Sequence, residues 1–335
     1  MASAPSVTPD AIFQLAQGFM ASKLFFTAGE IDLFAQLADG PKSQADLAAG
    51  LKLPVRSVGV VANAMVALGM LTFENGRYGN TEVAQVFLTG RGHDMRPLVR
   101  FWNRLSYPSW NGLVESVRKD GKKDAVFDFS PEDQALFSAG VEAASAGGGM
   151  ALAASYDFSK RARVLDIGGG TGSFLKFIHR AHPRVGLALF ELPGTAVYAR
   201  SRFSPEDAAA ITTIDGDMLK DALPGGYDVL LMAHLLHCCN VEENLGLLKR
   251  AHSSAPPRAQ LLAVDFFLNE TKTGPLPCAL MSAEFLTNTS GISYSAAEVR
   301  EWGTQTGWRF VELRPLAGPV SLLVLERGGH ADRNS

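Results

Sequence analysis

A glycine-rich turn, residues 168–172 (GGGTG), follows an apolar run in the second half of the 335-residue chain. Glycine lets the backbone adopt positive φ and lets a ligand approach the main chain closely. The dinucleotide-binding pattern needs Gly or Ala where this chain has Ser173, and the Lys of a phosphate-binding P-loop does not follow. We therefore expect Gly168, Gly170 and Gly172 to contact a different kind of ligand.

Three carboxylates stand at or just past the carboxyl ends of successive predicted strands and indicate what that ligand is. Asp166 precedes the glycines, where a carboxylate would repel a pyrophosphate but can pair with a cationic amino group. Glu191, followed by Leu192, ends the next strand, where a carboxylate can hold both hydroxyls of a ribose. Asp217 suits an adenine amino group, with Met218 against the ring. A phosphate-free ligand with these three parts is S-adenosylmethionine (SAM), and the alternative is an ordinary tight turn with solvated acids.

The order of these motifs resembles one enzyme family. The C-terminal half, with LDIGGGTG at 165–172 and GDM at 216–218, is similar to class I SAM-dependent methyltransferases. Almost the whole chain, including a stretch at 18–34 similar to a dimerisation helix, resembles the small-molecule O-methyltransferases. These are typified by caffeic acid and acetylserotonin O-methyltransferases and their bacterial natural-product relatives. The resemblance implies a homodimer with intertwined N-terminal helices, and methyl transfer from SAM to a hydroxyl of a small aromatic or polyketide-like metabolite.

The resemblance also implies a catalytic pair. Family members carry their general base in a Leu-His-Asp-Trp stretch, which maps the base onto His237. Asp265, 28 residues later (265 − 237), ends the following predicted strand, where its carboxylate could orient the imidazole and stabilise the imidazolium. A phenolic hydroxyl has a pKa of about 10 and an unperturbed histidine one of about 6.5, so a nearby histidine can raise the nucleophilicity of the hydroxyl near pH 7.

The sequence departs from the family pattern beside this pair. Cys238 and Cys239 replace the Asp-Trp that follows the base, and Ala233 stands where plant members often carry a Lys. Ser293 falls near the place of a second carboxylate in plant enzymes. These departures leave open a SAM-fold enzyme that methylates N or C, or one that catalyses a reaction other than methylation.

Two histidines and two cysteines within residues 234–239 superficially suggest a metal cluster. They lack a recognised ligand spacing and have no second Cys/His pair nearby, so we expect no metal. We expect His234 to have a packing or supporting role rather than a direct one, and the cysteines to be small buried residues.

A further set of side chains is expected to line the acceptor pocket. Met281, Phe285 and Asn288 are spaced i, i+4, i+7 and share one helical face, which by resemblance lines this pocket. Asn288 could hydrogen-bond a ring substituent. The segment between the two halves adds four candidates: Trp102, Tyr107, Trp110 and Met150. Any one of them could instead be a core residue, and together they favour a flat aromatic acceptor.

The first 90 residues have a helical pattern, with a winged-helix arrangement at 43–81. Ser43 can cap one helix, Pro54 opens a second helix through Leu71, and Asn75-Gly76 turns a hairpin. A winged helix raises a non-enzyme alternative, a ligand-sensing regulator that binds DNA. The helix at 54–71 carries a single basic residue, which disfavours phosphate contacts and favours a protein interface.

From residue 162 the pattern alternates between strand and helix. Long crossovers imply that the first five strands are parallel, and the short link at 315–319 implies an antiparallel hairpin at one edge. The predicted strands are Arg163–Ile167, Gly186–Glu191, Ile211–Ile214, Asp228–Met232, Leu261–Asp265, Arg309–Arg314 and Val320–Glu326.

The expected fold class is α/β, with a Rossmann-like SAM-binding domain and a mixed seven-stranded sheet after a mainly α winged-helix-like dimerisation domain. The predicted boundaries are 1–95 for the dimerisation domain, 96–158 for connecting helices, 159–327 for the SAM domain and 328–335 for a disordered tail.

The composition agrees with a protein that acts on a small molecule. The formal net charge is −3, whereas a dedicated nucleic-acid binder would carry an excess of positive charge. No run of about 18 uncharged apolar residues predicts a membrane span, and we find no targeting signal at the start. Three cysteines without paired spacing favour a reducing cytoplasm over a disulfide framework.

Overall fold

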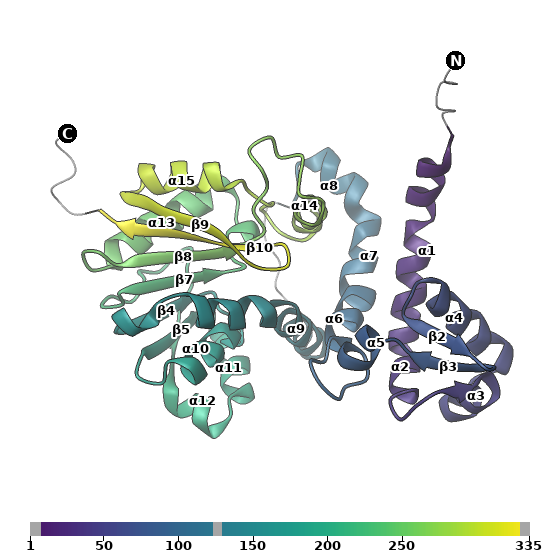
Figure 1. The fold of residues 1–335 in the computed structure, drawn as a ribbon. Helices are drawn as coiled ribbons and strands as arrows, with labels where there is room; N and C mark the ends of the chain where they lie inside the picture. Colours follow the sequence, from purple (N-terminus) through teal and green to yellow (C-terminus); the bar gives the residue numbers. More distant parts are fainter. Residues whose placement is uncertain (1–7, 123–128, 329–335) are drawn as a thin grey trace, which may run out of the picture. The chain divides into compact units, whose positions relative to one another are not determined.

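The computed structural model describes residues 8–122 and 129–328, which form two compact units (Figure 1). The first unit comprises Met1–Pro108 and Pro131–Ala144, and the second comprises Ser109–Ser130 and Ser145–Ser335. The segment expected as connecting helices, 96–158, contributes to both units. The tail expected at 328–335 lies outside the described residues apart from Gly328.

The first unit is mainly helical. A three-stranded antiparallel sheet of order β1-β3-β2 lies among its helices, with a core that includes Phe34, Leu47, Met65 and Tyr78. Its elements are α1 (Asp10–Glu30), α2 (Leu33–Gln36), β1 (Lys42–Ser43), α3 (Gln44–Leu51), α4 (Val55–Ala67), β2 (Leu71–Glu74), β3 (Arg77–Asn80), α5 (Glu82–Phe87), α6 (Arg96–Phe101), the π-helical turn η1 (Trp102–Ser106) and α7 (Tyr107–Ser109), whose last residue belongs to the second unit.

The expected winged-helix arrangement is present at 43–81, with one correction. Ser43 caps α3 through a reciprocal capping box, and Asn75 and Gly76 have the positive φ angles that a tight hairpin needs. The helix predicted from Pro54 to Leu71 is too long, because it ends at Ala67. Gly69 then adopts a φ of 74°, and Leu71 already pairs with β3 as the first residue of β2.

The second unit is built on a seven-stranded mixed sheet of order β6-β5-β4-β7-β8-β10-β9. The first five strands in the chain are parallel, and β10 pairs antiparallel with both β8 and β9. The predicted sheet and its edge hairpin are therefore confirmed, although β9 continues to Ala317, so the link expected at 315–319 is reduced to Gly318 and Pro319. The strands are β4 (Arg163–Ile167), β5 (Gly186–Glu191), β6 (Ile211–Asp215), β7 (Val229–Ala233), β8 (Gln260–Asp265), β9 (Trp308–Ala317) and β10 (Val320–Arg327).

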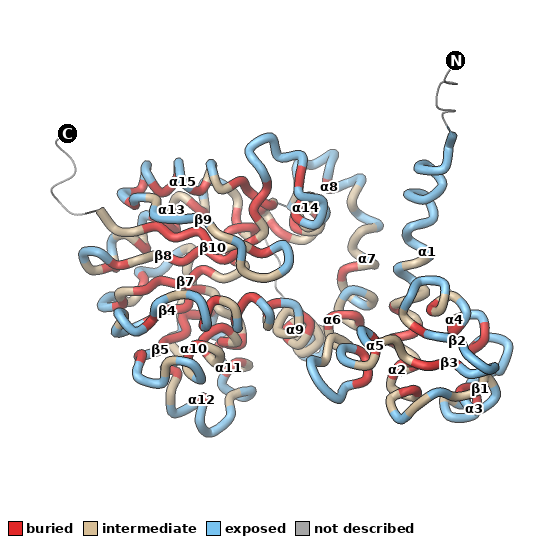
Figure 2. The backbone as a smooth tube through the Cα atoms, in the orientation of Figure 1, coloured by how far each residue is buried: buried red, intermediate tan, exposed pale blue. Residues whose placement is uncertain are grey.

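Helices cover both faces of this sheet. Along β4, Val164 and Leu165 point into different apolar clusters, so the strand is buried on both sides. Figure 2 shows the centre of the sheet coloured as buried. The remaining elements are η2 (Trp110–Gly112), α8 (Leu113–Lys119), α9 (Pro131–Ser155), η3 (Phe158–Lys160), α10 (Ser173–Ala181), α11 (Pro193–Arg202), α12 (Pro205–Ala210), η4 (Leu236–Cys238), α13 (Val241–Ser254), α14 (Leu276–Asn288) and α15 (Ala296–Gln305). Helix α9 runs from the first unit into the second.

The strand order places a switch point beside β4. The chain passes from β4 outward to β5 and β6, and then returns to β7 on the other side of β4. Ligands of open α/β sheets bind outside the carboxyl ends of the strands at such a point. Within the ranges 8–122 and 129–328, no helix combines the length and the hydropathy that a membrane span requires.

Candidate active site

The predicted glycine turn joins the carboxyl end of β4 to the start of α10. Gly168, Gly170 and Gly172 have φ angles of 65°, 59° and 70°, a region that other residues enter at a cost. The N–H of Gly168 donates to the carbonyl of Phe190 on β5 at 2.9 Å, which holds the turn against the neighbouring strand. The turn thus brings exposed backbone to the switch point, where a ligand can approach it.

Two carboxylates meet behind this turn. Asp166 is completely buried, and neither of its carboxylate oxygens has a hydrogen-bond partner among the described residues. Burial and the nearby Glu191 raise the pKa of Asp166 to about 8. The carboxylate of Glu191 accepts the N–H of Gly170 at 2.9 Å and that of Leu192 at 2.8 Å. Burial nevertheless raises the pKa of Glu191.

The electrostatic environment of these two carboxylates shows whether the site suits SAM, the ligand expected from the sequence. Two buried acids, one of them with orphaned oxygens, favour a ligand that brings a positive charge and hydrogen-bond donors. The amino group of SAM supplies both for Asp166, and its ribose hydroxyls can donate to the remaining lone pairs of Glu191. A pyrophosphate would add negative charge to the same place. The residues present therefore fit SAM.

The third acid, Asp217, follows β6. Its Oδ1 accepts the N–H of Leu219 at 2.9 Å, and its Oδ2 forms an ion pair with Lys220 at 2.8 Å. The neighbouring Met218 lies beside the glycine turn, since a Cβ built on Gly168 would sit 3.4 Å from the sulfur of Met218. The structure therefore brings Met218 to the glycine turn, whereas the carboxylate of Asp217 contacts Leu219 and Lys220.

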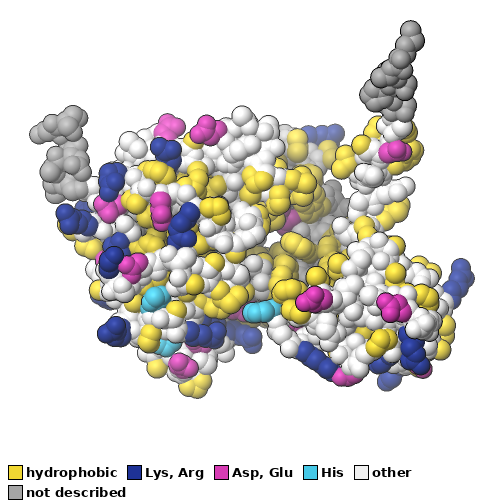
Figure 3. Space-filling model, in the orientation of Figure 1, with side chains coloured by type: hydrophobic (Ala, Val, Ile, Leu, Met, Phe, Trp, Pro, Cys, Tyr) yellow, Lys and Arg dark blue, Asp and Glu magenta, His cyan; other side chains and the backbone are white. Residues whose placement is uncertain are grey.

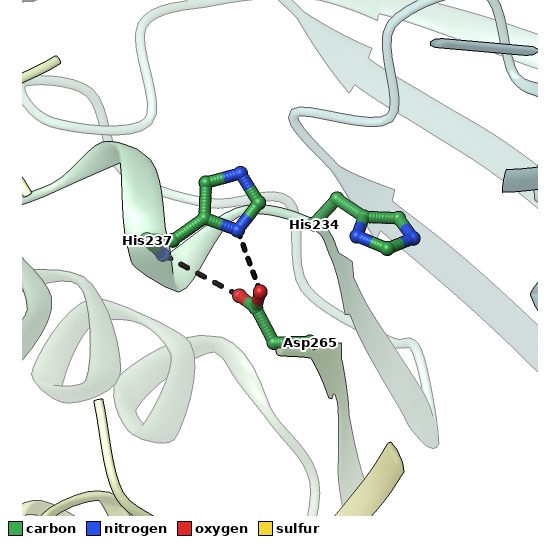
Figure 4. Close-up of side chains that lie close together, drawn as sticks. All are labelled: His234, His237 and Asp265. Atoms are coloured by element: carbon green, nitrogen blue, oxygen red, sulfur yellow. Dashed lines mark hydrogen bonds and ion pairs between the residues drawn. The ribbon is translucent and has the colours of Figure 1, made fainter. Parts of the chain in front are cut away.

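His237, in the middle of η4, and Asp265, at the end of β8, form a buried hydrogen-bonded pair (Figure 4). The Nδ1 of His237 lies 2.5 Å from Oδ1 of Asp265, and the backbone N–H of His237 donates to Oδ2 at 3.4 Å. The N–H of Phe266 also donates to Oδ1, at 2.8 Å. Since Nδ1 is engaged, Nε2 is the ring nitrogen that can exchange a proton with a ligand.

The charges of this pair support each other. Burial alone would lower the pKa of His237, but the charge and hydrogen bond of Asp265, together with the neighbouring Cys238, outweigh it and raise that pKa to about 10. Burial would raise the pKa of Asp265, but His237, together with His234 and the N–H of Phe266, outweighs it and lowers that pKa. A protonated imidazole is therefore well stabilised at this place.

Helix α14 holds the imidazole from the other side. The ring of Phe285 stacks on His237 with centroids 3.6 Å apart and planes 8° apart. The hydroxyl of Thr289, just after α14, donates to the carbonyl of His237 at 3.2 Å. Phe285, expected to line an acceptor pocket, thus lies directly against the candidate base.

His234 lies beside the pair without a hydrogen bond to it, and its ring centroid is 5.2 Å from that of Phe266 (Figure 4). Its φ of 55° is left-handed, and its Nε2 is buried without a partner in the described chain. Burial lowers the pKa of His234 to about 4, so this ring is neutral near pH 7. One donor atom from each of His234, His237 and Asp265 lies within 4.8 Å of the others, but the expectation of no metal stays a prediction.

The remaining acceptor candidates divide between the two units. Trp102 and Tyr107 belong to the first unit, where the Tyr107 ring packs edge-on against Phe26 of α1. In the second unit, Met150 is exposed on α9 and Met281 is partly buried on α14. Within the described part of the chain, Trp110 and Asn288 are joined through a residue that the sequence prediction missed.

That residue is Glu284. The indole N–H of Trp110 donates to its Oε2, and the amide of Asn288 donates to its Oε1 at 3.0 Å. Its position, one turn before Asn288 and next to Phe285, was a signal that it shares the predicted helical face.

Comparisons with known proteins agree with this geometry. A profile of the O-methyltransferase domain matches residues 124–309, and one of the O-methyltransferase dimerisation domain matches residues 13–90. The 3-hydroxy-5-methyl-1-naphthoate 3-O-methyltransferase of Streptomyces sahachiroi is 30% identical over 93% of this chain and 92% of its own length.

Two solved structures extend the likeness to the fold. Human N-acetylserotonin methyltransferase in complex with SAM superposes with a TM-score of 0.89 and 25% identity, covering 98% of this chain and all (100%) of that one. PigF, a SAM-dependent methyltransferase of Serratia, was solved with S-adenosylhomocysteine (SAH). It superposes with a TM-score of 0.85 and 30% identity, and the match covers 96% of this chain and 100% of that one. The chain therefore belongs to the family of SAM-dependent O-methyltransferases.

Proposed function

We propose that this chain methylates a hydroxyl of a small aromatic or polyketide-like acceptor, with His237 as the general base. The observation that supports this most is the buried His237–Asp265 pair, stacked on Phe285 at the carboxyl edge of the sheet. The named relatives act on a naphthoate and on acetylserotonin, which are both aromatic.

The role of His237 follows from its two nitrogens. Nδ1 is held by Asp265, so Nε2 is directed at the hydroxyl that is to be methylated. When Nε2 takes the hydroxyl proton, the carboxylate of Asp265 stabilises the imidazolium that forms. Such base catalysis contributes roughly 10²–10⁴-fold. Phe285 and Thr289 restrict the ring and its backbone, which keeps the base aligned during the transfer.

The cofactor would be held by the residues around the glycine turn. Bound SAM supplies a methyl group that its sulfonium already activates. Asp166 would pair with the amino group, and Glu191 would accept the ribose hydroxyls. Asp217 and Met218 would contact the adenine. The backbone at Gly168, Gly170 and Gly172, and Leu192 beside Glu191, would complete the contacts.

Aromatic and amide side chains would hold the acceptor. Trp110, Phe285 and Asn288 have the contacts described above, and Met281 lies on the same face of α14. Trp102, Tyr107 and Met150 stay predictions of the sequence.

We also propose that the protein is a homodimer in the cytoplasm, without a nucleic-acid or membrane partner. Five large apolar side chains in the first half of α1 are 52% to 84% exposed, a stripe that a monomer would leave in water (Figure 3). The residues in this stripe are Ile12, Phe13, Leu15, Phe19 and Met20. Arg56 is the sole basic residue of α4, which offers little to phosphates. The three cysteines are free thiols, which suits a reducing compartment.

The test combines turnover and binding. The purified chain is incubated with SAM and a panel of phenols, SAH is quantified, and the site of methylation is determined by NMR. O-methylated products are expected, and His237→Ala should lose roughly 10²–10⁴-fold in kcat while keeping its affinity for SAM. Wild-type turnover in His237→Ala would refute the role of the base, and products methylated on N or C would refute the hydroxyl as acceptor.

A further inference from the structure

The turn that carries His237 is short and has little support of its own. Turn η4 has three residues, and the chain is extended again at Cys239, with a φ of −115° and a ψ of 145°. Two backbone hydrogen bonds close it, from the N–H groups of residues 238 and 239 to the carbonyls three positions earlier, at 3.0 and 3.2 Å. A single 3₁₀ turn has poorer hydrogen-bond geometry than an α-helix, so its direction depends on the rest of the fold.

Asn244 holds this turn from helix α13. The side chain is completely buried, and it lies one helical turn after Asn240, which caps α13. Its Nδ2 donates to the carbonyl of Leu236 and to that of Cys239, both at 2.9 Å. Both hydrogens of the amide are used in this way. Because the two carbonyls stand on either side of His237 in the chain, one side chain spans the residue that carries the base.

These two hydrogen bonds are not required to satisfy the carbonyls. The carbonyl of Leu236 also accepts the N–H of Cys239, and the carbonyl of Cys239 also accepts the hydroxyl of Tyr294 at 2.7 Å. The Oδ1 of Asn244 is itself buried without a hydrogen-bond partner among the described residues, which is unfavourable. An amide with this disadvantage, whose hydrogen bonds go to carbonyls that already have donors, contributes mainly to the direction of the turn.

The segment after α14 packs on the same turn, backbone against backbone. A Cβ built on Gly291 would lie closer than 3.0 Å to the carbonyl oxygens of both His237 and Cys239, a separation that real side chains do not adopt. The φ of Gly291 is not positive, so close packing and not backbone conformation requires glycine here. Thr289 in the same segment donates to the carbonyl of His237. Residues 289–294 therefore restrain η4 in addition to Asn244.

We propose that Asn244 and Gly291 are positioning residues of the methyl transfer. Asn244 sets the direction of η4 through the carbonyls on either side of His237, and Gly291 lets residues 289–294 pack directly on the same backbone. Together they hold Nδ1 of His237 at Asp265 and so determine where Nε2 points. The inference rests on the proposed function, because it takes His237 as the base.

Asn244→Leu tests the first restraint, because leucine has a similar size and no donor. We expect kcat to fall roughly tenfold to a hundredfold, while the affinity for SAH, measured by calorimetry, changes little. The acid limb of kcat/KM should move to lower pH, since an imidazole displaced from Asp265 loses the partner that favours its protonated form. A wild-type kcat, a limb at the wild-type pH, or a loss of SAH affinity as large as the loss of kcat would overturn the role of Asn244.

Gly291→Ala tests the second restraint and does not depend on the first variant folding. The added Cβ would force η4 and residues 289–294 apart, so we expect the same fall in kcat and the same move of the acid limb. An unchanged kcat and an unchanged limb in this variant would overturn the role of Gly291.

Each variant has a matched control in the same unit. Thr306→Val removes a buried hydroxyl that donates to carbonyls at the end of α15. Gly225→Ala adds a Cβ at a place where the nearest atom would be 3.5 Å away, an ordinary contact. Both controls should keep the wild-type kcat and acid limb. A control that lost as much kcat as its partner variant, with the same move of the limb, would show that the effect is not specific to η4.

NMR separates this inference from the proposed reaction. In SAH-loaded protein with isotope-labelled histidine, the pH at which His237 titrates reports its pairing with Asp265 without any turnover. In both variants this pH should fall from the wild-type value toward 6.5, the ordinary pKa of histidine. A chain that methylates no phenol but shows this fall would support the inference and contradict the reaction. A chain that methylates phenols, and in which His237 titrates alike in the wild type and both variants, would do the opposite.

Discussion

The imidazole of His237 lies face to face with the phenyl ring of Phe285, with 3.6 Å between the ring centroids and 8° between the planes. Asp265 fixes one edge of the same imidazole through Nδ1. The ring is therefore restrained in two directions, by a flat partner on its face and by a carboxylate at its edge. Such restraint matters because a small displacement of a reacting group can cost much of the rate.

Removal of the stacked ring should misplace the base without removing it. We expect Phe285→Ala to lower kcat by roughly tenfold to a hundredfold, because the imidazole gains freedom beside Asp265. Phe285→Tyr, which keeps the aromatic face, should stay close to wild type. Steady-state kinetics give kcat, and calorimetry gives the affinity for SAH, which should change little. A loss of SAH affinity equal to the loss of kcat would indicate general damage to the fold instead of a displaced base.

The raised pKa of His237 predicts a rate that increases with pH. Burial opposes the protonated form, but Asp265 and Cys238 together raise the pKa of His237 to about 10, so the neutral imidazole becomes more abundant as pH rises from 7 toward that value. We expect the acid limb of the kcat/KM profile to lie above 6.5, the ordinary pKa of histidine. In Asp265→Asn the limb should move to lower pH, while kcat should fall because the imidazolium loses its partner. A limb at the same pH in both proteins would contradict the pairing.

The raised pKa of His237 also predicts how its contribution to the stability of the fold changes with pH. A group whose folded pKa is raised stabilises the fold below its unfolded pKa, and this contribution disappears as pH rises through the folded value. The His237 contribution should therefore be complete below about pH 6.5 and decline toward pH 10. Thermal unfolding between pH 6 and 10 should show a decline in Tm that is smaller in His237→Gln. An equal decline in both proteins would place its cause elsewhere in the chain.

Sequence pattern predicted the elements of the second unit well, because its strands are buried on both faces and separated by amphipathic helices. It also predicted that His237 and Asp265 would meet, since β7 and β8 are parallel neighbours whose carboxyl ends share one edge. It failed where a single backbone angle decides the outcome. Helix α4 ends before Gly69, and His234 adopts a left-handed φ that its residue type does not announce.

Glu284 shows a second limit of sequence reasoning. A glutamate near the end of a helix is ordinarily a solvated residue, and although Glu284 shares the predicted helical face with Asn288, this spacing does not show which group its carboxylate contacts. Its contact with Trp110 spans 174 positions, so only the packing of α14 against η2 reveals it. Residues whose role depends on one long-range polar contact are the ones that a pattern of spacing misses.

The apolar stripe on α1 predicts the assembly. Phe19 is 54% exposed, and we expect Phe19→Asp to shift the protein from dimer toward monomer, because a charge would have to be buried in the interface. Val197→Asp, at an exposed position on α11 of the other unit, is the control and should leave the assembly unchanged. Light scattering coupled to size exclusion measures the mass. A wild-type chain that is monomeric at micromolar concentration would refute the homodimer.

The ionised carboxylate of Asp166 should destabilise the cofactor-free protein, and binding of the cofactor should remove this destabilisation. Its folded pKa is raised to about 8 by burial and by Glu191, whereas the unfolded carboxyl titrates near 3.8. Between these values the folded state holds more protons than the unfolded state, so stability falls as pH rises from about 4 to 8. Asp166→Asn removes this pH-dependent loss of stability. It should unfold at a higher Tm than the wild type at pH 8, and the difference should shrink toward pH 5.

The same substitution should weaken SAM binding by roughly tenfold or more, because the neutral amide cannot pair with the amino group of the cofactor. Differential scanning fluorimetry at several pH values, with and without SAH, measures both effects in one experiment. In the wild type, saturating SAH should raise Tm more at pH 8 than in the variant, since only the wild type gains a partner for a buried carboxylate. Equal SAH-induced shifts in Tm in both proteins would show that Asp166 does not contact the cofactor. A lower Tm for the cofactor-free variant at pH 8 would show that the carboxylate already has a stabilising partner in the fold.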